Sequence, residues 1–225
     1  DSSLYEIDKI YWLVEDCKKF GTLPFAGLAR CGFIAIELLN SMVEKEIISE
    51  NEKKQFLNNI NTITSIIKKD LQKLSKANFL KKYGHLRPGT YDINSLNYKE
   101  GFNIYFNKTI FQKNVINKSP KIESKIKKPL KKLGIYNNAD ELLTFIKESI
   151  AYREYSKFIF SKSIDYIFEN LIKFGKRYNI SRDDLSHVKI DKILNMYFNL
   201  SSHETINNLK KHISENKKEY ISNKN

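Results

Sequence analysis

Apolar residues recur at intervals of three and four along most of the chain, which is the spacing of one face of an α-helix. The pattern begins at residues 7–14, in a helix that we expect to end at Gly21, and Pro24 then begins a second helix that is apolar around most of its circumference. The longest pattern covers residues 139–177, as one helix or as two kinked segments. No alternating pattern typical of a β-strand occurs, so we predict an all-α fold, a bundle of long antiparallel helices.

Four short polar segments predict helix starts, because their side chains can accept hydrogen bonds from the free amides of a first turn. They are Ser49–Glu52, Asn138–Glu141, Ser181–Asp184 and Ser201–Glu204. The first should open a helix that continues through Leu71. Shorter helices are expected before Gly84 and over residues 190–198.

Three segments depart from the helical pattern. Residues 84–97, GHLRPGTYDINSLN, are rich in Gly, Pro, Asn and Ser and predict an irregular loop. Residues 102–120 have weak periodicity and receive no assignment. Residues 121–132 are dense in lysine, with Pro129 among them, and are predicted to be a surface connection.

The length and cysteine content suit one intracellular domain. A chain of 225 residues can bury a core without covalent cross-links, so we expect a single helical domain over residues 1–225. Cys17 and Cys31 form neither a disulfide framework nor a metal site, which favours a reducing, cytoplasmic location. The chain begins with acidic residues rather than a signal peptide, and no uninterrupted run of about 18 apolar residues predicts a membrane-spanning helix.

The chain is basic, with 39 Lys and Arg against 26 Asp and Glu and a net charge of +13. Such a balance favours anionic partners, including nucleic acid, nucleotides and phosphorylated groups. Only five of these cations are arginines, which supply most bidentate contacts to nucleic acid. The lysines are spread among many Asn and Ile residues, as in the product of an A/T-rich genome. A solvated lysine surface is the simplest interpretation, and a helical nucleic-acid-binding module stays open as an alternative.

The loop contains the densest group of chemically useful side chains. Arg87 can bind an anion, His85 or Asp92 can move a proton, and Thr90 and Tyr91 can form hydrogen bonds. The structural alternative is a loop that merely ends a helix, with Arg87 in an ion pair.

Two further groups lie within predicted helices. Arg153 and Lys157 are one turn apart and share a face, where they could hold a carboxylate or phosphoryl group, and Glu154 could recognise an amine. The alternative is a solvated stripe. In residues 27–33 small side chains permit close helix packing, and Arg30, inside an apolar helix, needs a partner. No Cys and His pattern has metal-ligand spacing, so no metal is predicted.

Three blocks of sequence, in this order, resemble the central domain of phosphoenolpyruvate-synthase-like phosphotransferases. They are residues 15–30 (EDCKKFGTLPFAGLAR), 83–93 (YGHLRPGTYDI) and 153–158 (REYSKF). Within this superfamily the chain is most similar to the L-glutamine kinases of capsular phosphoramidate biosynthesis. The corresponding loop of rifampicin phosphotransferases is a looser match.

The resemblance implies one part of a three-part enzyme. Such enzymes combine an ATP-binding domain like that of pyruvate phosphate dikinase, a central acceptor-binding domain, and a small swivelling domain with a phosphorylated histidine. This sequence matches the central part and has no Thr-x-Gly-Gly-x-x-Ser-His-type carrier motif. We therefore expect ATP and Mg²⁺ to serve the full-length enzyme, and these residues to bind neither and to be inactive alone. The implied partners are the other two domains and a small acceptor, without nucleic acid or membrane.

The implied reaction is transfer of a phosphoryl group to the side-chain amide nitrogen of L-glutamine, with ATP giving AMP and phosphate. Arg87 would steady the transferring phosphoryl group, and His85 or Asp92 would accept the proton. Arg153 and Lys157 would hold the substrate carboxylate and Glu154 its ammonium group. The remaining residues implied for substrate binding are Thr90, Tyr91 and Arg30. A helical protein-interaction domain that binds no small molecule is the other alternative.

Overall fold

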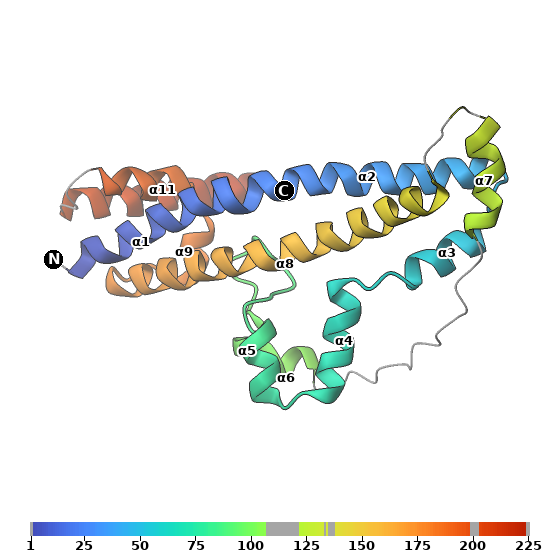
Figure 1. The fold of residues 1–225 in the computed structure, drawn as a ribbon. Coiled ribbons are helices and arrows are strands. Elements are labelled where there is room, and N and C mark those ends of the chain that lie inside the picture. Colours follow the sequence, from blue (N-terminus) through green and yellow to red (C-terminus); the bar gives the residue numbers. More distant parts are fainter. Residues whose placement is uncertain (1, 107–121, 133, 135–137, 199–202, 224–225) are drawn as a thin grey trace. The chain divides into compact units, whose positions relative to one another are not determined.

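The chain is described by a computed structural model that places residues 2–106, 122–132, 134, 138–198 and 203–223 (Figure 1). Every regular element in these ranges is a helix, which confirms the all-α prediction. In chain order they are α1 (Ser2–Asp16), the π-helix η1 (Cys17–Thr22), α2 (Leu23–Glu44), α3 (Glu50–Asn58), α4 (Ile63–Lys73), α5 (Lys76–Tyr83), α6 (Tyr98–Phe106), α7 (Ile122–Lys132), α8 (Ala139–Arg177), α9 (Arg182–Ser186), α10 (Ile190–Leu194), the 3₁₀-helix η2 (Asn195–Tyr197) and α11 (His203–Ser222).

These helices form two compact units. Unit 1 comprises residues 1–21, 80–107 and 160–225, and unit 2 comprises residues 22–79 and 108–159. The long helix α8 therefore contributes residues 139–159 to unit 2 and residues 160–177 to unit 1.

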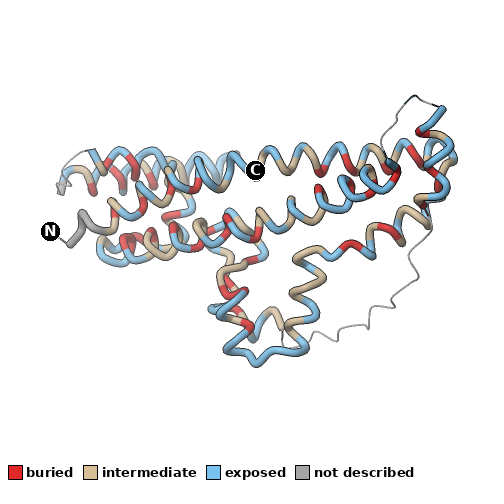
Figure 2. The backbone as a smooth tube through the Cα atoms, in the orientation of Figure 1, coloured by how far each residue is buried: buried red, intermediate tan, exposed pale blue. Residues whose placement is uncertain are grey.

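Unit 1 is organised around α1 and the second part of α8, which run antiparallel. Arg177, at the end of α8, donates a hydrogen bond of 3.2 Å to Glu6, near the start of α1. At the other end of the pair, Gly21 lies against Phe160. Buried positions recur at helical spacing along α1, α8 and α11 (Figure 2). The core residues at these positions are Ile7, Ile10, Val14, Ile167, Leu171, Phe174, Ile206, Leu209 and Ile213.

Unit 2 has a core built from α2, α3, α7 and the first part of α8. Helix α2 runs antiparallel to α8, because Gly32 lies against Arg153 while Met42 and Leu142 line one cavity farther along. The buried cluster contains Ala35, Leu39, Met42, Ile48, Phe56, Ile60, Ile122, Ile126, Leu130, Ala139, Leu143 and Ile146.

Two predicted helix boundaries were wrong. The helix expected to end at Gly21 continues through η1 into α2, and Pro24 is tolerated because it lies in the first turn of α2, where its missing N–H is not needed. The helix expected from Ser49 to Leu71 is divided into α3 and α4. The Ser49–Glu52 capping box does open α3, but Thr62 begins a new helix by accepting a hydrogen bond from the Ser65 amide.

The lysine-rich segment was also misassigned, since residues 122–132 form α7 rather than a connection. Ile122, Ile126 and Leu130 recur at every fourth position, so burying them fixes a helix even with Pro129 inside it. The cap predicted at Ser181 is present and opens α9, and α8 is one helix. Most of the unassigned segment, residues 107–120, and most of the cap predicted at Ser201–Glu204 lie outside the described residues.

One helical run bears on the expectation that no membrane-spanning helix is present. Glu6–Glu44 is long and apolar enough to cross a membrane by length and composition, and 17% of its most apolar window is buried. Counting only uninterrupted apolar residues missed this run, because charged residues, including Arg30 and Glu37, lie within it. The core helix of a soluble protein meets the same criterion, so the run does not decide the location of the protein.

Candidate functional site

The predicted loop, residues 84–97, joins α5 to α6 in unit 1 and is closed by backbone hydrogen bonds. The Tyr98 amide donates to the Leu86 carbonyl at 2.7 Å, and the Lys99 amide donates to the Gly84 carbonyl at 3.2 Å. These two bonds hold the ends of the loop together. The prediction of an irregular loop after α5 is confirmed, whereas the helix that follows it, α6, was not predicted.

Further hydrogen bonds define a turn at the tip of the loop. The Asp92 amide donates to the Gly89 carbonyl at 3.0 Å, and the Ser95 amide donates to the Asp92 carbonyl at 3.2 Å. The Ser95 hydroxyl accepts from the Gly89 amide at 3.1 Å, and the Asp92 carboxylate accepts from the Asn94 amide at 2.9 Å. The tip is therefore an ordered structure with its own side-chain and backbone bonds.

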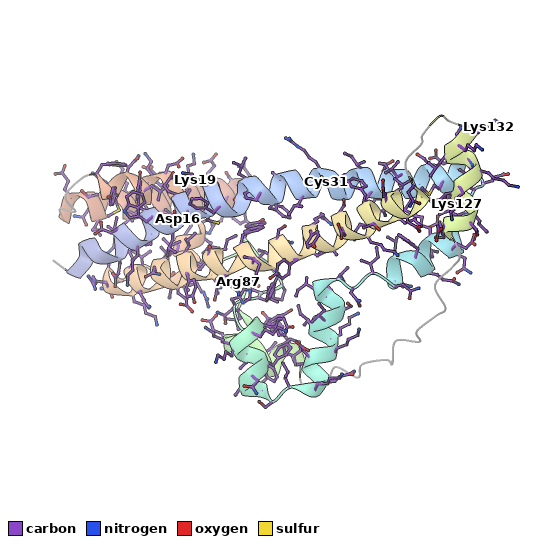
Figure 3. All side chains as sticks on the ribbon, viewed as in Figure 1. Asp16, Lys19, Cys31, Arg87, Lys127 and Lys132 are labelled. Carbon is purple, nitrogen blue, oxygen red and sulfur yellow. The ribbon has the colours of Figure 1, made fainter. Side chains whose placement is uncertain are left out.

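Arg87 anchors this loop inside unit 1 (Figure 3). Its side chain is only 3% exposed, and its Nη2 donates to the carboxylate of Asp165 on α8, which is equally buried. Its Nη1 donates to the Ser95 carbonyl at 3.1 Å, and the guanidinium lies 4.8 Å from the ring centre of Phe168. The ion pair that the sequence left open as the structural alternative for Arg87 is therefore present.

Asn97 completes the buried polar group. Its side-chain amide donates to both oxygens of Asp165, at 3.1 and 3.5 Å. Its side-chain carbonyl accepts from the Glu100 amide at 2.9 Å, which caps the start of α6. Sequence reasoning missed both Asn97 and Asp165. The Asn97–Glu100 spacing of a capping box and an acid on a mostly apolar helix were the available signals.

The other predicted loop residues are more accessible. Asp92 is exposed, Tyr91 is 66% exposed, and His85 and Thr90 are half-buried. The Tyr91 ring stacks on Phe160 of α8 with ring centres 6.5 Å apart. Partial burial, and secondarily the nearby Cys17 thiol, raise the pKa of the Tyr91 hydroxyl.

Part of the first sequence block, in η1, also lies beside Phe160 in unit 1. A Cβ atom on Gly21 would lie 2.9 Å from Cβ of Phe160 and 3.5 Å from Sγ of Cys17, so a glycine permits this approach. π-helical turns are rare in proteins, and those that do occur are frequently found at functional sites. Unit 1 thus brings parts of the first and second blocks together around Phe160.

The remaining predicted site residues belong to unit 2. Nη1 of Arg153 donates to Oε1 of Glu154 at 2.9 Å, and the guanidinium lies 5.6 Å from the Phe33 ring centre. The Arg153 side chain passes directly over Gly32, where a Cβ atom would lie 2.8 Å from Cδ of Arg153. Its buried Nε has no hydrogen-bond partner among the described residues. This geometry confirms close helix packing at Gly32.

Lys157 and Arg30 differ in accessibility. Lys157 is half-buried on α8, one turn beyond Arg153. Arg30, which was expected to need a partner inside an apolar helix, is exposed on α2. It is two positions, or about 200° of helix, from Gly32, which places it away from the face that meets α8.

Two cavities of about 800 and 570 Å³ lie within unit 2. Neither is lined by a predicted site residue. Among the described residues, no group of three or more His, Cys, Asp or Glu side chains is arranged to hold a metal ion.

Chemically, unit 1 offers an ordered polar loop on a buried anchor, and unit 2 offers an adjacent cation and anion on α8. The chain matches no protein-family model, no curated protein and no solved structure.

Proposed function

We propose that these residues are the acceptor-binding domain of a cytoplasmic, ATP-dependent phosphotransferase that works through a phosphohistidine carrier. The proposed acceptor is the side-chain amide of L-glutamine, phosphorylated for capsular phosphoramidate synthesis. The three sequence blocks that resemble phosphoenolpyruvate-synthase-like enzymes motivate the proposal.

The observation that carries the proposal is the construction of the second block. A simple connection between two helices needs no buried ion pair, since burying two charges gains little stability. Here Arg87 and Asp165 are buried beneath a turn whose tip residues, Thr90 to Asp92, are partly or fully exposed. Ordered polar loops on a rigid support are where binding and catalytic residues concentrate.

The pair on α8 supports an amino acid as the acceptor. A free amino acid carries a carboxylate and an ammonium group on one carbon, so its recognition needs a cation and an anion close together. Arg153 and Glu154 are hydrogen-bonded to each other at 2.9 Å and half-buried, and Lys157 adds a second cation on the same helix. A bound amino acid can replace the contact between these two side chains, with its carboxylate paired to Arg153 and its ammonium group paired to Glu154.

The chemical difficulty of the reaction lies in the acceptor, because the lone pair of an amide nitrogen is delocalised. ATP would supply the phosphoryl group through the carrier histidine of the complete enzyme, and Mg²⁺ would neutralise charge on the phosphates of ATP. As the new N–P bond forms and the bond to the carrier breaks, the amide nitrogen loses a proton, for which His85 and Asp92 are the candidate acceptors. Arg87 is the proposed cation for the phosphoryl group, and that contact requires its ion pair with Asp165 to open.

Calorimetric titration of the chain with L-glutamine tests the proposal, with L-glutamate and L-asparagine as competing ligands. We expect selective binding of L-glutamine that falls at least about tenfold in Glu154→Gln and Lys157→Met, since each removes one charge contact. Lys54→Met removes an exposed cation from the same unit and should leave the affinity unchanged. Equal heats for the three amino acids, or no heat with any of them, would count against L-glutamine as the acceptor.

The alternatives predict different outcomes. A nucleic-acid-binding module would bind RNA or DNA with an affinity that falls steeply as salt is raised. A protein-interaction domain would bind neither L-glutamine nor nucleic acid.

A further inference from the structure

We infer that Asp165 and Asn97 are positioning residues that hold the 84–97 loop in its conformation by fixing Arg87. While the ion pair with Asp165 is closed, Arg87 acts through the loop and does not touch the ligand. The inference deepens the proposed function and rests on it insofar as the tip of the loop contacts the acceptor.

The hydrogen bonds of Arg87 run in two directions, which is what positioning requires. One nitrogen is bonded to Asp165 on α8, and another is bonded to the Ser95 carbonyl on the far limb of the same loop. The planar guanidinium therefore links both limbs of the loop to a single point on α8. A lysine could not make both bonds in this fixed geometry, because its ammonium is a point charge without the fork of donors.

Asn97 ties the end of the loop to the same carboxylate. Its amide group bonds Asp165, while its carbonyl oxygen caps α6. The Asp165 carboxylate thus accepts hydrogen bonds from two residues of the loop, Arg87 near its start and Asn97 at its end. Movement of either limb would break a hydrogen bond to a buried carboxylate.

Burying these polar and charged groups stabilises unit 1 less than expected of a contact whose purpose is purely structural. Arg87, Asn97 and Asp165 are among the few buried polar residues of the described chain, and an apolar cluster of similar volume would stabilise the unit at least as well. Polar clusters of this kind select one arrangement, because a buried donor that moves away from its acceptor loses a hydrogen bond that nothing replaces. The arrangement selected here holds the Gly89–Ser95 turn, with Tyr91 on Phe160.

Hydrogen–deuterium exchange of the 225-residue chain tests whether the anchor holds the tip. In Asp165→Asn we expect the Gly89, Asp92 and Ser95 amides to exchange at least about tenfold faster, while protection in α11 is unchanged. Asp191→Asn, at an exposed aspartate of unit 1, is the matched control and should leave the loop as it is. Arg87→Lys keeps the charge and should loosen the tip less, which gives a second measurement if Asp165→Asn folds poorly.

A double variant separates positioning from general stability. Arg87→Met with Asp165→Leu removes both charges, so resistance to urea should largely return, short of the bond that Asn97 loses. The tip should still exchange fast, and L-glutamine should bind at least about tenfold more weakly than to the parent. A merely structural pair predicts that all three properties recover together, which would overturn the inference. Unchanged exchange at the tip in Asp165→Asn, or equal acceleration throughout unit 1, would overturn it too.

The two proposals fail in distinguishable ways. If the parent chain does not bind L-glutamine, the proposed function fails, and exchange at the tip still decides whether Asp165 and Asn97 hold the loop. If the parent binds L-glutamine and Asp165→Asn binds it equally well, the positioning role fails while the proposed function stands.

Discussion

Alanine substitutions at Gly21, Gly27 and Gly32, which lie in one continuous helical run, test the packing of this run. The local contacts of each glycine decide whether the substitution raises or lowers the free energy of unfolding. A Cβ atom at Gly27 meets nothing within 4 Å, whereas at Gly21 it would lie 2.9 Å from Cβ of Phe160. At Gly32 it would lie 2.8 Å from Cδ of Arg153. The contacts differ in kind, because Cβ of Phe160 moves only with the backbone of α8, while the Arg153 side chain can swing aside.

The expected free-energy changes follow from these contacts. Gly27→Ala should stabilise the chain by about 1 kcal/mol, which is the difference in helix propensity between alanine and glycine. Gly21→Ala gains a similar amount but overpacks the contact with Phe160 at a cost of about 1–3 kcal/mol, so it should be neutral to destabilising by about 2 kcal/mol. Gly32→Ala should be close to neutral. Its effect should instead be weaker binding of L-glutamine, because Arg153 must leave its place beside Glu154.

Urea denaturation measures these differences. Far-UV circular dichroism follows total helix, and fluorescence of Trp12, the sole tryptophan, follows unit 1. The order of unfolding midpoints should be Gly27→Ala above Gly32→Ala above Gly21→Ala. A Gly21→Ala variant as stable as Gly27→Ala would refute the argument that Gly21 is needed for contact with α8.

Three further predictions concern single interactions. Asp165→Leu should lower the free energy of unfolding by about 3–5 kcal/mol, because it leaves the Arg87 guanidinium buried without its partner, and urea midpoints should largely recover in the double variant with Arg87→Met. Hydrogen bonds from Lys217 and then Ser181 lower the pKa of Asp184 to about 2. The folded pKa is depressed, so this stabilisation is complete above the unfolded value near 4 and is lost as the pH falls toward 2. Solvent screening limits it to about 1 kcal/mol, and Lys217→Met should flatten that part of the stability–pH curve. Ser49→Ala removes a capping-box hydroxyl and should cost about 1 kcal/mol in the same denaturation assay.

The helices were predictable where buried apolar residues recur at helical spacing in the sequence. Ser49–Glu52 and Ser181–Asp184 were recognisable as caps because the partners are three residues apart. The boundary at Gly21 was not, because a glycine that ends a helix and a glycine that admits a neighbouring helix have the same local sequence. Only the position of Phe160, far along the chain, distinguishes the two roles.

The candidate site was predictable to a similar extent and for the same reason. The composition of residues 84–97 is enough to predict an irregular polar loop, and it identifies Arg87 as an unusual cation. It cannot decide whether that cation faces a ligand or a protein partner, because the partner, Asp165, is 78 residues away on another element. With that partner known, Tyr91 and Asp92 are the predicted site residues of the loop whose side chains are exposed and open to contact with an acceptor. The chemistry of the loop and the rigidity of the loop are therefore carried by different residues, and variants of the anchor and of the tip should separate them.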